Sequence, residues 1–284
     1  MHDKNHKVMK AEKILFITQE INPYVPDSNL TTLGRDIPIT ALDLNREVRT
    51  FMPKWGNINE RRNQLHPVQR ISGMNLIIND TDYQLIIKVA SIVGTRMQVY
   101  FIDDDDFFAK RLEECDHDGN EYTDNFQRCV FYARSVLETV KKLRWTPDIV
   151  HCQGWISSMV PLYLKTAYAD EPCFRDCRVV YTVSPNKLTL PSGEDAGQVI
   201  AFRNAGPDCI SEFGDNLTPN DWMKLAIKYS DGVVFERNLP QSAIMKYAKD
   251  AGKPIMAGKG VTPNDYIEFF DKVWSENRPT TQED

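Results

Sequence analysis

Residues 147–165 read PDIVHCQGWISSMVPLYLK, and this stretch decides the fold of the chain. Ile149–Cys152 is a short apolar run, which is typical of a buried strand, and apolar residues then recur at helical spacing. The two patterns meet at Gln153 and Gly154. Ligands of open parallel sheets bind at the carboxyl ends of strands, and a glycine there lets backbone approach closely. We therefore expect a strand, a helix opened by Trp155, and a binding site at their junction.

The N-terminal segment predicts the same architecture. Ile14–Thr18 is apolar without alternation, as in a strand that is buried on both faces. Thr31 or Thr32 is expected to cap a helix that runs to about Asn45, and Glu47–Met52 is the next strand. A strand, a helix and a strand in this order begin a doubly wound sheet. The predicted fold class is α/β, with a mainly parallel, Rossmann-like sheet.

The rest of the chain extends this pattern. Residues 54–74 are expected to form loop and short helix, and residues 187–216 a long polar loop. The expected strands are 75–78, 83–90 and 97–102, which form a hairpin or meander, and 178–183 and 232–235; the expected helices are 124–143, 218–229, 241–249 and 263–274.

Composition excludes several classes of function. The chain has 284 residues, 42% of them hydrophobic and 26% charged, and a net charge of -6. This charge offers no basic surface for nucleic acid or an anionic membrane. No apolar run reaches the roughly 18 to 20 residues that span a bilayer, and residues 1–13 lack the apolar core of a signal peptide. We expect a cytoplasmic protein that binds neither nucleic acid nor membrane.

The sequence indicates no metal, no cofactor and no disulfide framework. Six cysteines are scattered along the chain. The pair Cys173 and Cys177 lacks the further ligands of a metal site, so a plain loop is the preferred interpretation. Adjacent residues on an extended chain point to opposite faces, so the acidic run Asp103–Asp106 is interpreted as a solvated strand end and helix cap.

The residues from Tyr122 to Lys165 resemble the N-terminal catalytic domain of bacterial glycogen and starch synthases. The resemblance covers roughly residues 13 to 236 and is weakest between about 57 and 95. It implies the N-terminal half of a type-B glycosyltransferase fold, with an extension at 1–12, a domain at 13–276 and a polar tail at 277–284. The roughly fifty residues after 236 are too few for a second domain of the usual size. The residues that carry the resemblance include Lys13–Thr18, Glu20, Asn45–Arg49, Asp124, Asn125, Arg128, Pro147–His151, Trp155 and Pro161–Lys165.

Three polar sites of that family are substituted here. The family's donor loop reads Lys-any-Gly-Gly-Leu, and Pro26 replaces its lysine while Asp27 follows. The loss removes an ammonium that would neutralise a diphosphate, and the aspartate would repel one. The family's His-Ala-His-Asp-Trp-His places Gly154 at the aspartate, and its Thr-Ile-His-Asn places Ser184 at a histidine. No residue is therefore assigned a catalytic role.

Seven residues remain candidates for sugar or ligand binding. A histidine at a strand end is more often a hydrogen-bonded structural residue, whereas Trp155 either stacks on a sugar or packs in the core. The resemblance implies a cleft between the two domains of the family's enzymes, and Glu20 is either an acid that faces this cleft or a solvated loop residue. Neutral polar groups at strand ends suit the recognition of hydroxyl groups. The candidates are Glu20, Asn29, His151, Gln153, Trp155, Ser184 and Asn186.

Three functions follow from these residues and from the resemblance. The first is the family reaction, glucosyl transfer from ADP-glucose to an α-1,4-glucan, impaired or lost in the isolated chain. The second is a non-catalytic protein that binds a glucan or sugar and regulates storage-glucan metabolism. The third is a subunit, or a homo-oligomer, that needs a protein partner carrying the second domain; its cleft face should then be apolar or self-associating.

Overall fold

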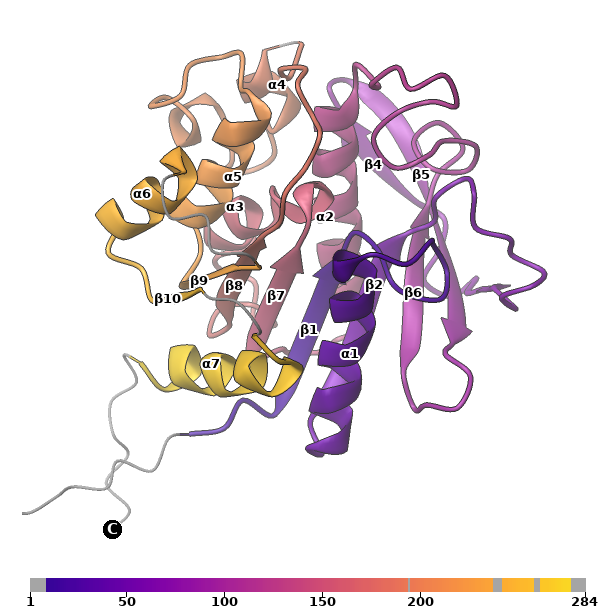
Figure 1. The fold of residues 1–284 in the computed structure, drawn as a ribbon. Coiled ribbons are helices and arrows are strands. Elements are labelled where there is room, and N and C mark those ends of the chain that lie inside the picture. The colour runs from indigo at the N-terminus through magenta and orange to yellow at the C-terminus, as the bar shows by residue number, and fades with distance from the viewer. Residues whose placement is uncertain (1–8, 194, 237–241, 258–260, 277–284) are drawn as a thin grey trace, which may run out of the picture.

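The computed structural model describes residues 9–193, 195–236, 242–257 and 261–276. Its centre is a sheet of ten strands in the order β10-β9-β8-β7-β1-β2-β6-β5-β3, with β4 paired to β5 (Figure 1). The strands from β10 to β6 run parallel, and β5 is antiparallel to its neighbours. Their bounds are β1 Lys13–Thr18, β2 Glu47–Pro53, β3 His66–Pro67, β4 Met74–Ile78, β5 Thr81–Ser91, β6 Gln98–Asp103, β7 Ile149–Gln153, β8 Arg178–Val183, β9 Gly232–Phe235 and β10 Ile255–Ala257.

Helices cover both faces of the sheet, which confirms the predicted doubly wound α/β class. On one face α1 and α7 pack together over Phe16, Ile149 and Val180, and on the other face α2, α3 and α5 cover the larger core. The helices are α1 Asn29–Asp43, α2 Asn125–Lys142, α3 Val160–Lys165, α4 Ala196–Val199, α5 Pro219–Lys228, α6 Ala243–Asp250 and α7 Pro263–Ser275, with single turns η1 Trp155–Ser157 and η2 Pro207–Cys209.

Three local predictions need correction. Ser28, and not Thr31 or Thr32, caps α1: its Oγ accepts from the Thr31 amide, and Thr31 Oγ1 accepts from the Ser28 amide. The helix expected after Gly154 is broken into the turn η1 and the short α3. Residues 54–74, all of which the structure describes, contain no helix, and the three-residue strand β10 was not expected.

The acidic run after β6 is also less solvated than expected. Asp103 is 2% exposed and Asp104 is 4% exposed. Lys88 of β5 reaches across the sheet and places its Nζ 2.8 Å from Asp103 Oδ2. Asp104 Oδ1 accepts from the amides of Asp106 and Phe107, but residues 105–110 form turns, so it caps no helix there, contrary to the prediction. The neighbouring strand supplies the cation that makes a buried carboxylate tolerable.

Two further predictions concern the ends of the chain and membranes. The polar tail at 277–284 and most of the extension at 1–12 lie outside the described residues. Among the helices that the structure describes, none combines the length and apolar character needed to cross a bilayer.

Candidate functional site

A groove lies at the carboxyl end of the parallel sheet. Its volume is about 830 Å³, and it opens where the chain leaves β1, β8 and β9. The strand order reverses beside it, because β1 lies between β2 and β7. Such switch points are where open α/β sheets bind ligands. The lining residues are Gln19, Glu20, Ser28, Asn29, Leu30, Leu112, Glu113, Glu114, Cys115, Asp116, Gly119, Pro185, Asn186, Lys187 and Glu236.

Glu20 is the most perturbed acid of the groove. Its carboxylate accepts from Gln19 Nε2 at 2.9 Å and from Ser28 Oγ at 3.5 Å. Burial raises the pKa of Glu20 from 4.5 to about 7, with Glu113 and Glu114 adding to the rise. The hydrogen bond from Gln19 acts in the opposite direction. At neutral pH this side chain is therefore divided between its neutral form, which donates a hydrogen bond, and its charged form.

The charge of the groove is strongly negative. Among the described lining residues, five side chains carry a carboxyl group and one, Lys187, carries an amine. Burial raises the pKa of Glu114, and the charges of Glu113 and Glu121 reinforce that shift against Lys187. The described residues nonetheless hold no group of three or more acids, histidines or cysteines arranged to bind a metal ion.

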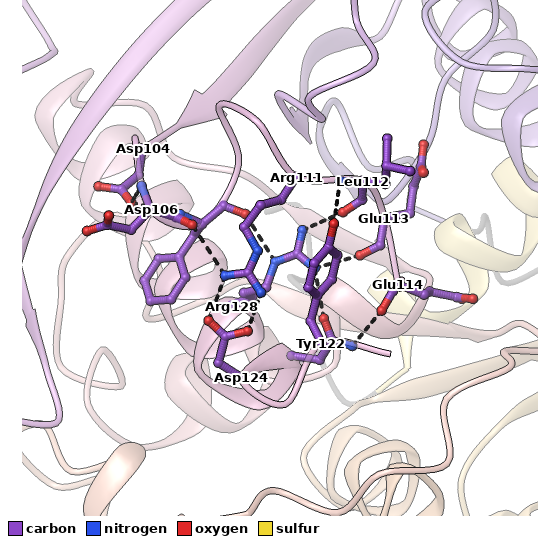
Figure 2. A network of polar contacts seen from close by, with 11 residues as sticks. Asp104, Asp106, Arg111, Leu112, Glu113, Glu114, Tyr122, Asp124 and Arg128 are labelled. Atoms are coloured by element: carbon purple, nitrogen blue, oxygen red, sulfur yellow. Dashed lines mark hydrogen bonds and ion pairs between the residues drawn. The ribbon is translucent and has the colours of Figure 1, made fainter. Parts of the chain in front are cut away.

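Arg128 of α2 holds the segment that supplies Glu113 and Glu114 (Figure 2). Its side chain is fully buried, and its guanidinium donates to the carbonyls of Phe107, Leu112 and Glu113 at 2.7–3.1 Å. Burial lowers the pKa of Arg128 to about 9. The acidic wall of the groove is thus fixed through its backbone by a buried cation.

A second arginine braces the same segment. Arg111 forms an ion pair with Asp124 and lies over the ring of Tyr122, 4.1 Å from its centroid (Figure 2). The Tyr122 hydroxyl accepts from the Leu112 amide, and Asn125 Nδ2 donates to the Glu114 carbonyl. These contacts all lie within residues 111–125, so their role is to position the wall.

Gly154 occupies a place that no other residue type fits. Its φ is +84° and its ψ is 166°, a region that is essentially restricted to glycine. A Cβ there would lie 2.6 Å from both Cβ and Oε1 of Gln19. Gln19 Oε1 in turn accepts from the Trp155 amide at 3.1 Å. The space beside this family position is therefore filled by the side chain of Gln19.

Gln153 lies directly behind the groove. It is 1% exposed, its Oε1 accepts from Thr18 Oγ1 at 3.1 Å, and its Nε2 donates to Glu236 Oε1 at 3.3 Å. It positions Glu236 on the groove wall. Its carboxamide reaches no solvent, so hydroxyl recognition falls to other residues.

Three further candidates lie in the core. His151 is 2% exposed, and its Nε2 is 2.8 Å from Thr182 Oγ1, as its structural interpretation expected. Burial lowers the pKa of His151 to about 3, so the ring is neutral at physiological pH. Trp155 is 3% exposed, with its ring 6.3 Å from that of Trp55, so it is not placed to stack on a sugar. Ser184 is 6% exposed, and its Oγ has no partner among the described residues.

The structure thus brings three of the seven candidates, Glu20, Asn29 and Asn186, to the groove surface. Pro26 is exposed and does not line it. Sequence reasoning missed Glu113, Glu114, Asp116, Lys187 and Glu236. Glu236 directly follows β9, so the rule that ligands gather at strand ends would have found it. The acids before α2 have no such signal, because Arg128 brings that segment to the groove only in three dimensions.

Comparison with known proteins agrees with this geometry. The family described as the starch synthase catalytic domain matches residues 13–235. Glycogen synthases of Chlorobium phaeobacteroides and Chlorobium limicola are each 34% identical over 172 residues, which is 60% of this chain and 35% of theirs. The chain thus spans about a third of the length of the curated relatives that it matches.

A solved structure shares the fold. It is the catalytic domain of starch synthase IV from Arabidopsis thaliana bound to ADP and acarbose, with a TM-score of 0.68 and 17% identity. The match covers 88% of this chain and 51% of that one. Because the family match takes in most of the sheet and the whole wall held by Arg128, the chain belongs to the starch synthase catalytic-domain family.

Proposed function

We propose that this chain binds a neutral α-glucan or maltooligosaccharide in the groove and does not transfer glucose from ADP-glucose. The observation that carries this proposal is the charge of the groove, five carboxyl groups against Lys187 among its described residues. Like charges repel, so the carboxylates of the wall oppose a nucleotide diphosphate, whereas an uncharged sugar meets no such penalty.

The substituted family positions support the same conclusion. Pro26 has no ammonium, and Asp27 beside it is bonded to Asn22. At Gly154 the side chain of Gln19 leaves no room for a carboxylate. Ser184 is buried below the surface. A donor sugar diphosphate would therefore find neither the cation nor the polar groups that stabilise a departing phosphate in transfer reactions.

The remaining groove surface suits carbohydrate hydroxyl groups. Asn29 and Asn186 place carboxamides in the groove, where Asn186 Oδ1 also accepts from the Leu188 amide at 3.1 Å and Nδ2 donates to Met223 Sδ at 3.8 Å. Glu20 is divided between a donating and an accepting form near neutral pH. The volume of about 830 Å³ lies within the range of small-molecule sites. The relative from Arabidopsis thaliana was solved with both ADP and acarbose. We infer that the carbohydrate ligand class carries over to this chain and that the nucleotide does not.

Two other functions, a working glucosyltransferase and a subunit of a larger assembly, are alternatives to glucan binding alone. Family membership favours a working glucosyltransferase that uses ADP-glucose and an α-1,4-glucan. A subunit that docks on a partner should present an apolar cleft face, yet the described groove residues are mostly polar and acidic. Homo-oligomerisation through that face meets the same charge repulsion.

Calorimetry with maltoheptaose, ADP and ADP-glucose tests the proposal, together with radiolabelled glucosyl incorporation into glycogen. We expect heat of binding for maltoheptaose alone and no incorporation. Asn29→Ala and Asn186→Ala should each weaken maltoheptaose binding about tenfold, because each removes hydrogen bonds to the sugar. Asp82→Asn, which changes an exposed acid on the β4–β5 hairpin, is the matched control and should bind as the unchanged protein does.

Binding of ADP-glucose in the micromolar range, with incorporation of glucose that Glu20→Gln abolishes, would contradict the proposal. So would maltoheptaose affinity that neither asparagine substitution alters. Melting temperatures of the variants separate loss of binding from loss of folding.

A further inference from the structure

A second cavity lies apart from the groove and shares no lining residue with it. It is about 260 Å³ in volume and lies between the loop after β1, the helix α1, the segment before β3 and the end of β5. Its walls are Asn22, Pro23, Tyr24, Arg35, Arg62, Asn63, Gln64, Ser91, Ile92 and Val93. The loop that carries Asn22, Pro23 and Tyr24 is the one that presents Glu20 to the groove.

The charge of this cavity is opposite to that of the groove. Arg35 and Arg62 line it, and none of the described lining residues is acidic. Arg35 has one contact, 3.4 Å to Asp36, between side chains that are each 38% exposed. Such surface pairs contribute little. The Arg62 guanidinium has neither an ion pair nor a hydrogen bond among the described residues; only its backbone amide is bonded, to Asn59.

Two arginine side chains line one cavity, although the protein has a net charge of -6. Together they create a local positive potential that favours binding of an anion. Guanidinium is the group best suited to bind phosphate oxygens through paired hydrogen bonds. The neutral part of the wall adds side-chain amides of Asn63 and Gln64 and the hydroxyl of Ser91. These groups match the hydroxyl groups of a sugar.

The size of the cavity limits the ligand. A volume of about 260 Å³ is below the usual range for drug-sized ligands, so a single sugar unit is the largest polyol that fits. Tyr24 closes one wall; it is 7% exposed, and its hydroxyl has no hydrogen-bond partner within the described part of the chain. The exposed side chain of Val93 lies at the rim.

We propose that this cavity binds a small phosphorylated sugar, with Arg35 and Arg62 holding the phosphate and Asn63, Gln64 and Ser91 contacting the sugar hydroxyl groups. The site is spatially separate from the groove, since the two share no lining residue. A bound ligand also contacts the loop of Asn22–Tyr24. It would thereby restrain the segment that carries Glu20.

Calorimetry on the full chain with a hexose monophosphate, inorganic phosphate and glucose tests the site. We expect the hexose monophosphate to bind with a dissociation constant of about 1 mM or below, inorganic phosphate more weakly, and glucose not at all. Arg62→Gln and Arg35→Gln should each weaken binding about tenfold, because each removes a charge-assisted hydrogen bond. Both side chains are exposed or half-buried, so the fold should survive either change.

Arg61→Gln is the matched control, because Arg61 is an exposed neighbour of Arg62 that does not line the cavity. It should change the affinity by less than about twofold. The groove variants Asn29→Ala and Asn186→Ala should leave hexose monophosphate binding unchanged, which separates this site from the proposed function. Melting temperatures of all variants verify folding.

Four results would overturn the proposal. They are the absence of binding up to about 10 mM hexose monophosphate, equal weakening by Arg61→Gln and Arg62→Gln, equal affinity for glucose, and binding of an acidic peptide without binding of either phosphate compound. Equal affinity for inorganic phosphate and the hexose monophosphate would overturn the assignment of the sugar contacts.

Discussion

Replacing Gly154 by alanine should destabilise the protein by roughly 2–6 kcal/mol. Two independent effects add. The φ of +84° with ψ 166° costs any residue with a Cβ about 1–3 kcal/mol. The new Cβ would lie 2.6 Å from Cβ and Oε1 of Gln19, and overpacking of this kind costs about 1–3 kcal/mol. Gln19 is 4% exposed and is bonded to the Trp155 amide, so it has little freedom to move away.

Urea denaturation of four variants separates the two effects. Gly119→Ala is the control, because Gly119 also has φ +84° but a Cβ added there would meet no atom within 4 Å, so that variant has the cost of a positive φ without a clash. Gln19→Gly removes both clashing atoms, Cβ and Oε1, and also an acceptor of a buried amide, which costs about 1–3 kcal/mol. In the double variant Gln19→Gly/Gly154→Ala the clash is therefore absent. The two single variants and the double variant form a double-mutant cycle with the unchanged protein. The double variant should be about 1–3 kcal/mol more stable than the sum of the two single changes predicts.

A Gly154→Ala variant no less stable than Gly119→Ala would refute this reasoning, as would a cycle without interaction energy. Either result would show that Gln19 does not fill the space beside Gly154. The argument that the side chain of Gln19 leaves no room for a carboxylate at this family position would fail with it.

Two other substitutions test the groove. Because the pKa of Glu20 is raised from 4.5 to about 7, the folded protein holds a proton that the unfolded chain releases, so this group lowers the free energy of unfolding as pH rises from about 4.5 to about 7. Glu20→Gln should accordingly raise the free energy of unfolding by at most about 3 kcal/mol at pH 8 and hardly at all near pH 4, as measured by urea titrations at the two pH values. The control Asp82→Asn should not change this free energy at either pH. Equal stabilisation by Glu20→Gln at the two pH values would argue against a perturbed pKa of Glu20. Arg128→Met should cost about 3–5 kcal/mol, because it leaves buried carbonyls unpaired; a variant that melts with the unchanged protein would mean that water replaces these bonds.

Much of the fold was predictable from local patterns. The continuous apolar runs at 14–18 and 232–235 identify buried parallel strands, and both appear where expected. Thr218 and Pro219 identify the start of α5, where Thr218 accepts from the Asp221 amide. The wrong predictions also have local causes. Ser28, Thr31 and Thr32 all carry a hydroxyl group that could cap α1. Ser28 is the cap, because Thr31 Oγ1 accepts from the Ser28 amide and completes a capping box.

The candidate site was less predictable. Residues next to strand ends, such as Glu20 and Asn186, were found because the sheet topology brings strand ends to one edge. His151 was placed at a strand end by its motif, yet it pairs in mid-strand with Phe16 and Val180, and its ring packs against Phe270 of α7. That helix lies more than a hundred residues away in sequence, so no local pattern predicts the contact between His151 and Phe270.

The sequence by itself determined most of the strands and helices and the α/β class, because apolar period and capping chemistry act between neighbours in the chain. The resemblance to the family identified the substituted positions. Only the tertiary structure decided the character of the site. Arg128 and Asn125 hold the acids at 113 and 114 at the groove by bonds to the carbonyls of Glu113 and Glu114, and Gln19 fills the space beside Gly154. Burial and charge depend on residues that are distant in sequence, so the sign of the groove and the pKa of Glu20 arise only when the chain is folded.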